Sequence, residues 1–126
     1  LLAVFLYGAY PQLENTYKAI LKNNYYKNNS TPREMIEYLK RNIKKGDVVF
    51  VNQASNSDYL YYKQIYEIQN KELIESPQFF KKGAKVWFFL PNDAKRTYEK
   101  DIKHKYKIYY HNVKGNSGLL YGIKVR

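Results

Sequence analysis

Two short, almost continuous apolar runs dominate the hydrophobic pattern of this chain. The first is VVFV at residues 48–51, and the second is AKVWFFL at residues 84–90. Apolar runs without alternation are typical of strands that are covered on both faces, as in a parallel sheet. We therefore expect two adjacent parallel strands, with buried side chains that include Val48, Phe50, Val86, Trp87 and Phe88.

Helical spacing governs the apolar residues around these runs. Thr31-Pro32-Arg33-Glu34 supplies a capping hydroxyl, a proline at the first helical position and a glutamate three residues after the cap. Met35, Ile36, Leu39 and Ile43 then share one face, and Lys44-Lys45-Gly46 is typical of a helix C-terminus. Two further helices are predicted, one carrying Tyr59, Leu60, Tyr62 and Tyr66, the other from Asn92 or Asp93 to about His104.

The remaining strands complete an α/β pattern. A weak strand is expected at residues 66–68, and two closing strands are expected at 107–112 and 119–125, joined by the turn Gly115-Asn116-Ser117-Gly118. Strands that alternate with helices favour parallel pairing through right-handed crossovers. The predicted fold is a small Rossmann-like three-layer sandwich, with a mostly parallel sheet and an antiparallel C-terminal hairpin.

The start of the chain differs from the rest. Residues 1–10 (LLAVFLYGAY) are apolar and uncharged but too few to cross a bilayer, which needs about twenty residues. We interpret them as the end of a truncated transmembrane helix; the alternative is a buried strand or helix of the domain itself. Residues 11–30 are polar and are predicted to be a linker, which leaves 31–126 as a soluble α/β domain.

Composition narrows the chemistry. The chain has 126 residues, no cysteine and two histidines, His104 and His111, so disulfides and thiolate metal sites are excluded. The formal net charge of +11 favours anionic partners. Abundant Lys, Asn, Tyr and Ile, with little Arg, also match the codons of an AT-rich genome, which offers an explanation without any binding role.

No catalytic, cofactor-binding or metal-binding residue is predicted. The chain lacks a glycine-rich dinucleotide or phosphate loop and a nucleophile elbow. In open α/β sheets, ligands lie beyond the carboxyl ends of the strands, where the strand order reverses. The polar residues expected there, as ligand-facing side chains, are Asn52, Gln53, Ser55, Asn56, Asn92 and Asp93, with Tyr62 as a stacking face. The alternative is that they only cap the following helices.

Four segments carry a pattern that recurs in one family of membrane proteins. They are Gly46-Asp47-Val48-Val49-Phe50-Val51, Tyr61-Tyr62, Lys85-Val86-Trp87-Phe88-Phe89-Leu90 and Gly118-Leu119-Leu120-Tyr121-Gly122-Ile123. In this order they resemble the C-terminal soluble domain of multi-pass bacterial membrane glycosyltransferases of the GT-C class, which are related to protein mannosyltransferases and the aminoarabinose lipid A transferase. The resemblance covers nearly the whole chain, about residues 1–125, and Lys85 stands where the family usually has arginine.

The resemblance implies an accessory, non-catalytic domain of an enzyme that transfers a sugar from a polyprenyl-phosphate donor. Its partners would be its own upstream membrane domain and, through the full-length protein, the donor and acceptor. The domain would lie outside the cytoplasm at a bacterial membrane; long domains cross membranes largely regardless of charge. The alternative function is a basic binding module for nucleic acid or anionic lipid, although no nucleic-acid-binding motif is visible.

Overall fold

The computed structural model describes residues 31–52 and 56–126, which form a mixed α/β domain with an open five-stranded sheet and three α-helices. The predicted segments 1–10 and 11–30, with Gln53 and Ser55, lie outside the described residues. The elements are α2 (Pro32–Asn42), β1 (Val48–Val51), α3 (Asn56–Ile65), β2 (Glu72–Leu73), η2 (Pro77–Phe79), β3 (Lys85–Leu90), α4 (Ala94–Thr97), η3 (Tyr98–Ile102), β4 (Tyr106–Lys114) and β5 (Ser117–Lys124).

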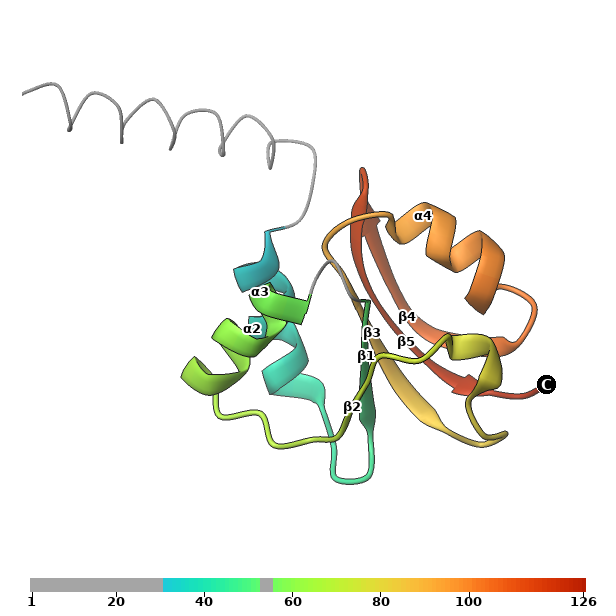
Figure 1. Cartoon of the computed structure of the whole chain (residues 1–126), viewed down its shortest axis with the longest axis horizontal. Coiled ribbons are helices and arrows are strands. Elements are labelled where there is room, and N and C mark those ends of the chain that lie inside the picture. Colours follow the sequence, from blue (N-terminus) through green and yellow to red (C-terminus); the bar gives the residue numbers. More distant parts are fainter. Residues whose placement is uncertain (1–30, 53–55) are drawn as a thin grey trace, which may run out of the picture.

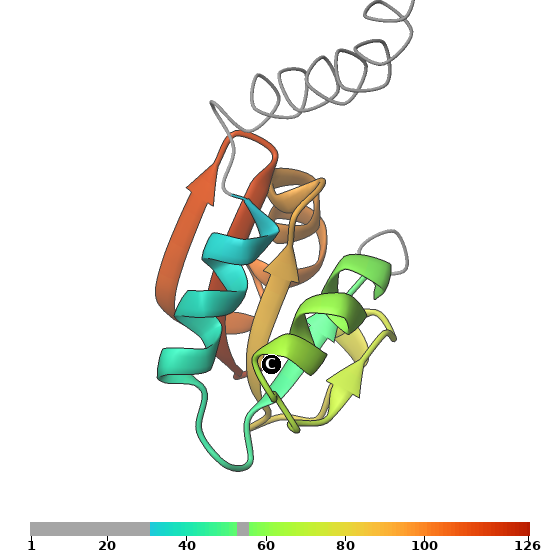
Figure 2. The same ribbon diagram turned by 90° about the vertical axis from the view of Figure 1, so that its left-hand side faces the viewer.

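The sheet forms the middle of three layers. Helices α2 and α3 cover one face, and α4 and η2 lie against the other (Figures 1 and 2). The strand order is β2-β1-β3-β5-β4. Strands β2, β1 and β3 pair in parallel, whereas β5 pairs antiparallel with both β3 and β4. The sheet is therefore mixed rather than mostly parallel, because the returning hairpin joins the sheet through its second strand.

The two apolar runs form the centre of the sheet, as predicted. Val48 pairs with Val86, and Phe50 pairs with Phe88, in parallel register. Alternate side chains enter two separate cores, so Val49 and Val51 face α2 and α3, whereas Phe50 faces α4. Phe50, Val86, Trp87 and Phe88 are buried, but Val48 is only half-buried because it lies near the amino end of the strand.

Helix α2 begins as the sequence predicts. The Thr31 hydroxyl accepts a hydrogen bond from the Glu34 amide at 3.1 Å, and Pro32 occupies the first turn. Met35, Ile36 and Leu39 are buried against the sheet. The helix ends earlier than Gly46, because Ile43 adopts an extended backbone and the chain then turns into β1.

The expected strand at residues 66–68 is wrong. The Ile68 amide donates to the Lys63 carbonyl at 3.0 Å, and the intervening Glu67 has a φ of 55°, so this segment closes the C-terminus of α3. Ile68 is buried in the core and holds the turn in place. The edge strand β2 forms further on, at Glu72–Leu73.

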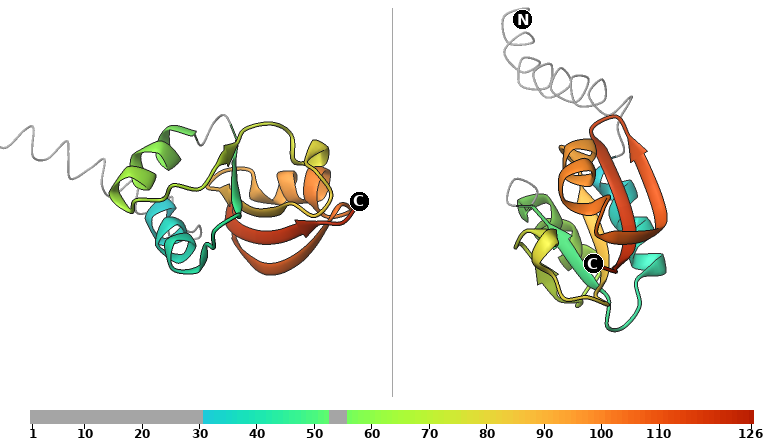
Figure 3. Two further views of the ribbon diagram at one scale, coloured as in Figure 1. Left: turned by 90° about the horizontal axis from the view of Figure 1, so that it is seen from below. Right: turned by 90° about the vertical axis from the view of Figure 1, so that its right-hand side faces the viewer.

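The C-terminal hairpin is antiparallel, as predicted, and longer than expected. Strands β4 and β5 are joined by a tight turn at Gly115 and Asn116, and β4 carries a bulge between Ile108 and Tyr110. Figure 3 shows the two strands curving together along one side of the molecule. A Cβ placed on Gly122 would lie 2.9 Å from the Lys107 carbonyl oxygen, so this position requires glycine.

The third helix lies where it was expected but begins differently. Helix α4 continues into η3, so that helical turns cover 94–102. Asp93 precedes α4 with a φ of 57° and makes no side-chain capping bond, so the capping interpretation is wrong for Asp93. The Ala94 amide instead donates to the Asn116 carbonyl of the hairpin turn at 3.0 Å. In the described part of the chain, no helix has the length and apolarity needed to cross a membrane.

Candidate functional site

The edge predicted to bind a ligand contains a small polar cleft. Strands β1 and β3 end side by side, and the loops that follow them enclose about 210 Å³ between Asn52, Asp93 and the outer side of α4 and η3. Arg96, Thr97, Lys100 and Asp101 complete the lining. Strand order reverses between β1 and β3, so the cleft occupies the position at which open α/β sheets commonly bind ligands.

Only part of the predicted set meets at this cleft. Asn52 and Asp93 line it, whereas Asn56 begins α3 and Asn92 precedes Asp93 without lining the cleft. Tyr62 packs against the core beneath α2 and α3, on the opposite face of the sheet from α4. Tyr62 is therefore not a stacking face for this cleft.

Sequence reasoning missed the basic residues of the cleft. Arg96 follows Asp93 by three residues, and Lys100 follows Arg96 by four, a spacing that places helical residues on one face. That spacing was the available signal. The cleft thus combines carboxylates, a guanidinium, an ammonium and an amide, and no ion pair joins these groups to each other or to other described residues. Such a set offers hydrogen-bond donors and acceptors side by side.

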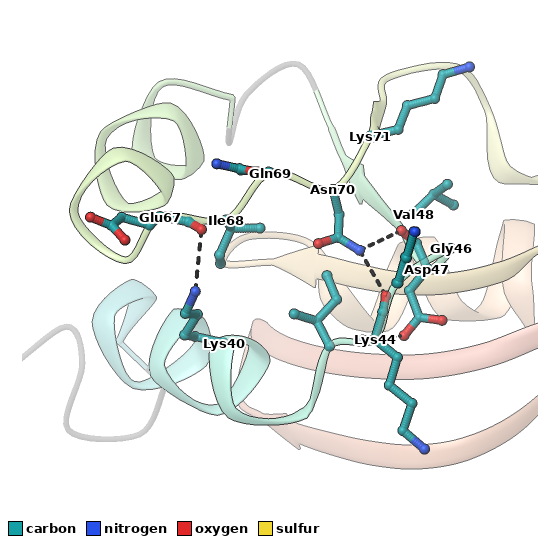
Figure 4. Close-up of a pocket in the computed structure, with 12 residues that line it drawn as sticks. Lys40, Lys44, Gly46, Asp47, Val48, Glu67, Ile68, Gln69, Asn70 and Lys71 are labelled. Carbon is teal, nitrogen blue, oxygen red and sulfur yellow. Dashed lines mark hydrogen bonds between the residues drawn. The ribbon is translucent and has the colours of Figure 1, made fainter.

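A larger cleft of about 600 Å³ lies at the opposite end of the parallel strands, beside the amino end of β1 (Figure 4). Four lysines line it: Lys40, Lys44, Lys45 and Lys71. At its centre, the Asn70 amide nitrogen donates to the carbonyl oxygens of Lys44 and Asp47, both at 2.9 Å. No pattern in the sequence indicated this cleft, because lysines at positions 44 and 45 are also expected at the C-terminus of a helix.

A buried carboxylate lies beneath that cleft. Asp47 is 4% exposed, and its Oδ2 accepts hydrogen bonds from the Lys44 amide at 3.0 Å and from Trp87 Nε1 at 3.1 Å. The Tyr121 ring packs against Trp87 with centroids 4.6 Å apart. Burial, and then the nearby Asp47 charge, raise the pKa of Tyr121. Asp47 thereby connects the start of β1 to the middle of β3. The two hydrogen bonds that its carboxylate accepts give it a structural role.

Lys124 is the second notable buried group. Its ammonium donates to the carbonyl oxygens of Gln78 and Phe80, at 2.9 and 2.6 Å, and lies 5.8 Å from the centre of the Tyr106 ring. Burial, and then repulsion from Lys105, lower the pKa of Lys124. This lysine caps the C-terminal end of η2, where the carbonyl groups have no hydrogen-bond partners within the helix.

The described residues contain no group of three or more His, Cys, Asp or Glu side chains that could hold a metal ion. The chain matches no protein family model, no curated protein and no solved structure. The chemistry of its own clefts and the resemblance of its segments therefore carry the functional argument.

Proposed function

We propose that this chain is the C-terminal accessory domain of a membrane glycosyltransferase that uses a polyprenyl-phosphate sugar donor. The domain is proposed to lie outside the cytoplasm, joined to an upstream membrane part that performs the chemistry. Its role is to position that part and to admit the acceptor. We also propose that the parallel strands β2, β1 and β3 correspond to half of a Rossmann-like sheet.

The observation that carries this proposal is the contact between segments that bear the resemblance. Gly46-Asp47, Lys85-Val86-Trp87 and the Tyr121 strand lie far apart in the sequence, yet Trp87 hydrogen-bonds Asp47 and packs on Tyr121. Residues that share a structural purpose are expected to occur together in a family of domains. The contact therefore supports a common architecture and gives these residues a structural role, as an accessory domain requires.

The placement of the polar cleft supports the same proposal. Helix α2 runs antiparallel to β1, so the start of α2 lies at the end of the domain where β1 and β3 finish (Figure 1). The chain that precedes Thr31 thus joins the domain at the end that carries Asn52 and Asp93. A sugar donor or acceptor that reaches this end of the domain finds the hydrogen-bonding groups of the cleft.

The test uses the complete reading frame that encodes this chain, expressed in a bacterial host. We expect the protein to sediment with membranes and to transfer labelled sugar from a polyprenyl-phosphate donor. Deleting residues 31–126 should strongly reduce transfer, and protease added outside spheroplasts should remove the domain. A protein that remains in the soluble fraction, or transfer that is unaffected by the deletion, would contradict the proposal.

The lysine-lined cleft favours a second candidate function, a basic module that binds nucleic acid or anionic lipid. Lys44, Lys45 and Lys71 form no ion pair with described residues, so their charges are available to phosphate groups. Separate measurements of binding to anionic vesicles and to single-stranded oligonucleotides distinguish the two ligands, and a fall in affinity with added salt identifies contacts with phosphate groups. Loss of binding in Lys44→Glu, but not in Lys103→Glu, would place the ligand in this cleft.

A further inference from the structure

Strand β4 is a long edge strand, and no described residue pairs with its outer side. It ends the strand order and pairs with β5 alone among the described strands. Nine residues form it, and the bulge at Tyr109 separates its first part from a regular segment, Tyr110–Val113. An unpaired strand edge presents a row of amide and carbonyl groups that another extended chain can pair with.

Two grooves flank this regular segment, one on each face of the sheet. Tyr110 and Asn112 line a groove of about 110 Å³ whose other wall is α2, through Tyr38 and Arg41. His111 and Val113 line a groove of about 370 Å³ whose other wall is α4 and η3, through Lys95 and Tyr98. Consecutive β4 residues thus alternate between the two grooves, as the side chains of an added strand would also do.

We propose that the edge of β4 at Tyr110–Val113, with its two flanking grooves, binds an extended acidic peptide segment by strand addition. We call this edge and its grooves the β4 slot. In strand addition, main-chain hydrogen bonds supply affinity, and pockets for alternate side chains supply specificity. The slot is a property of the domain itself and does not depend on the proposed transferase.

The side chains that line the two grooves of the slot determine which types of peptide residue fit each groove. The groove beside α4 contains the Tyr98 ring, which meets His111 edge to face at 5.3 Å, and the Val113 side chain, so it suits apolar residues. The groove beside α2 carries the Arg41 guanidinium, 5.9 Å from the centre of the Tyr38 ring. Acidic residues on that side of the peptide meet a cation.

Charge favours an acidic peptide over a second copy of the chain. Strand β4 contains two lysines, one histidine and no acidic residue. Two carboxylates line the grooves: Glu99 is paired with Lys103 at 3.2 Å, and Glu34 lies in the groove beside α2 that also contains Arg41. The two lysines of β4, together with Arg41 and Lys95, outnumber them. Two copies pairing through β4 would bring these lysines together on chains that each carry a net charge of +11. Lys107 and the bulge also protect the first part of the edge from self-pairing.

The probe is a synthetic peptide of alternating glutamate and valine, about six residues long, the usual length of a strand. Binding to the whole chain is measured by fluorescence anisotropy at physiological salt, and amide NMR shifts locate it. We expect shifts centred on His111–Val113. Methylating alternate peptide nitrogens, which removes main-chain donors without changing charge, should weaken binding about tenfold or more.

Charge-reversed variants locate the grooves. Arg41→Glu, in the groove that receives the acidic residues, should weaken binding about tenfold, and Lys95→Glu, in the groove that receives the apolar residues, should weaken it about threefold. Lys82→Glu, in the turn before β3 and away from the slot, should change it by less than about twofold. All three variants change the net charge equally. The proposal is wrong if the methylated peptide binds as well as the alternating one, or if a peptide of the same composition does so with its glutamates and valines in two separate blocks. It is also wrong if Lys82→Glu weakens binding as much as Arg41→Glu, or if no β4 amide shifts. Concentration-dependent dimerisation through β4 would also overturn it.

Discussion

The hydrogen bond between Trp87 and Asp47 offers the sharpest test of how this domain is held together. Trp87 is 4% exposed, and its indole nitrogen donates to the equally buried Asp47 carboxylate at 3.1 Å. Trp87→Phe keeps an aromatic ring against Tyr121 but removes the donor. Asp47→Ala removes the acceptor, and Asp47→Asn retains one acceptor oxygen as a matched control.

The expected magnitude follows from the charge and burial of the pair. A hydrogen bond to a charged group stabilises a protein by about 1.5–3 kcal/mol. Trp87→Phe also leaves a small void, and Asp47→Ala also leaves the Lys44 amide without its acceptor. Each single variant therefore loses more stability than this hydrogen bond contributes. A double-mutant cycle removes those separate costs and should return a coupling of about 1.5–3 kcal/mol.

Urea unfolding followed by far-UV circular dichroism measures the cycle, because Trp87 is the only tryptophan and its fluorescence is lost in the variant. Asp47→Asn should be the mildest of the single variants at this position. A coupling below about 0.5 kcal/mol, the usual scatter for independent sites, would refute the reasoning. The role given to the Gly46-Asp47 and Val86-Trp87 segments would then have to be withdrawn.

Three further predictions concern the core and the hairpin. Phe88→Ala, at a fully buried site, should lower the free energy of unfolding by about 3–5 kcal/mol in urea titrations, whereas Phe79→Ala, at a side chain 76% exposed, should change it by less than about 0.5 kcal/mol. Gly122→Ala should cost about 1–3 kcal/mol, because its Cβ would lie 2.9 Å from the Lys107 carbonyl oxygen; an unchanged melting temperature would show that the hairpin yields at no cost. Tyr59→Phe should stabilise the protein by about 1 kcal/mol, since the buried Tyr59 hydroxyl finds no hydrogen-bond partner among the described residues. Burial raises the pKa of Tyr59, so the unfolded state releases this proton before the folded state does, and stability falls as the pH rises above about 10. The stability of Tyr59→Phe should fall less steeply there.

For the candidate site, the sequence predicted the end of the sheet at which it lies but not most of the residues that line it. The polar residues after β1 and β3 were expected at one edge, and Asn52 and Asp93 do line one cleft. Tyr62 was assigned to that cleft wrongly, because the side of a helix that meets the core depends on how the helix crosses the sheet. The lysine-lined cleft and the β4 slot combine segments that are distant in the sequence, and no local pattern indicates such combinations.

The sequence by itself determined the local elements of this protein. The Thr31 cap, the helical spacing after it, the two apolar strands and the glycine-containing hairpin turn all appear where the pattern predicted them. These features depend on capping groups, backbone preferences and periodicity over a few residues, which a single segment carries within itself.

Only the tertiary structure decided the order of the strands. Strand β5 lies between β3 and β4, so the sheet became mixed and β4 became its edge. Strand order is set by which exposed edge and which apolar face a strand meets, and those partners come from distant parts of the chain. The turn at Glu67 was settled in the same way, because burying Ile68 outweighs the unfavourable positive φ of the residue before it.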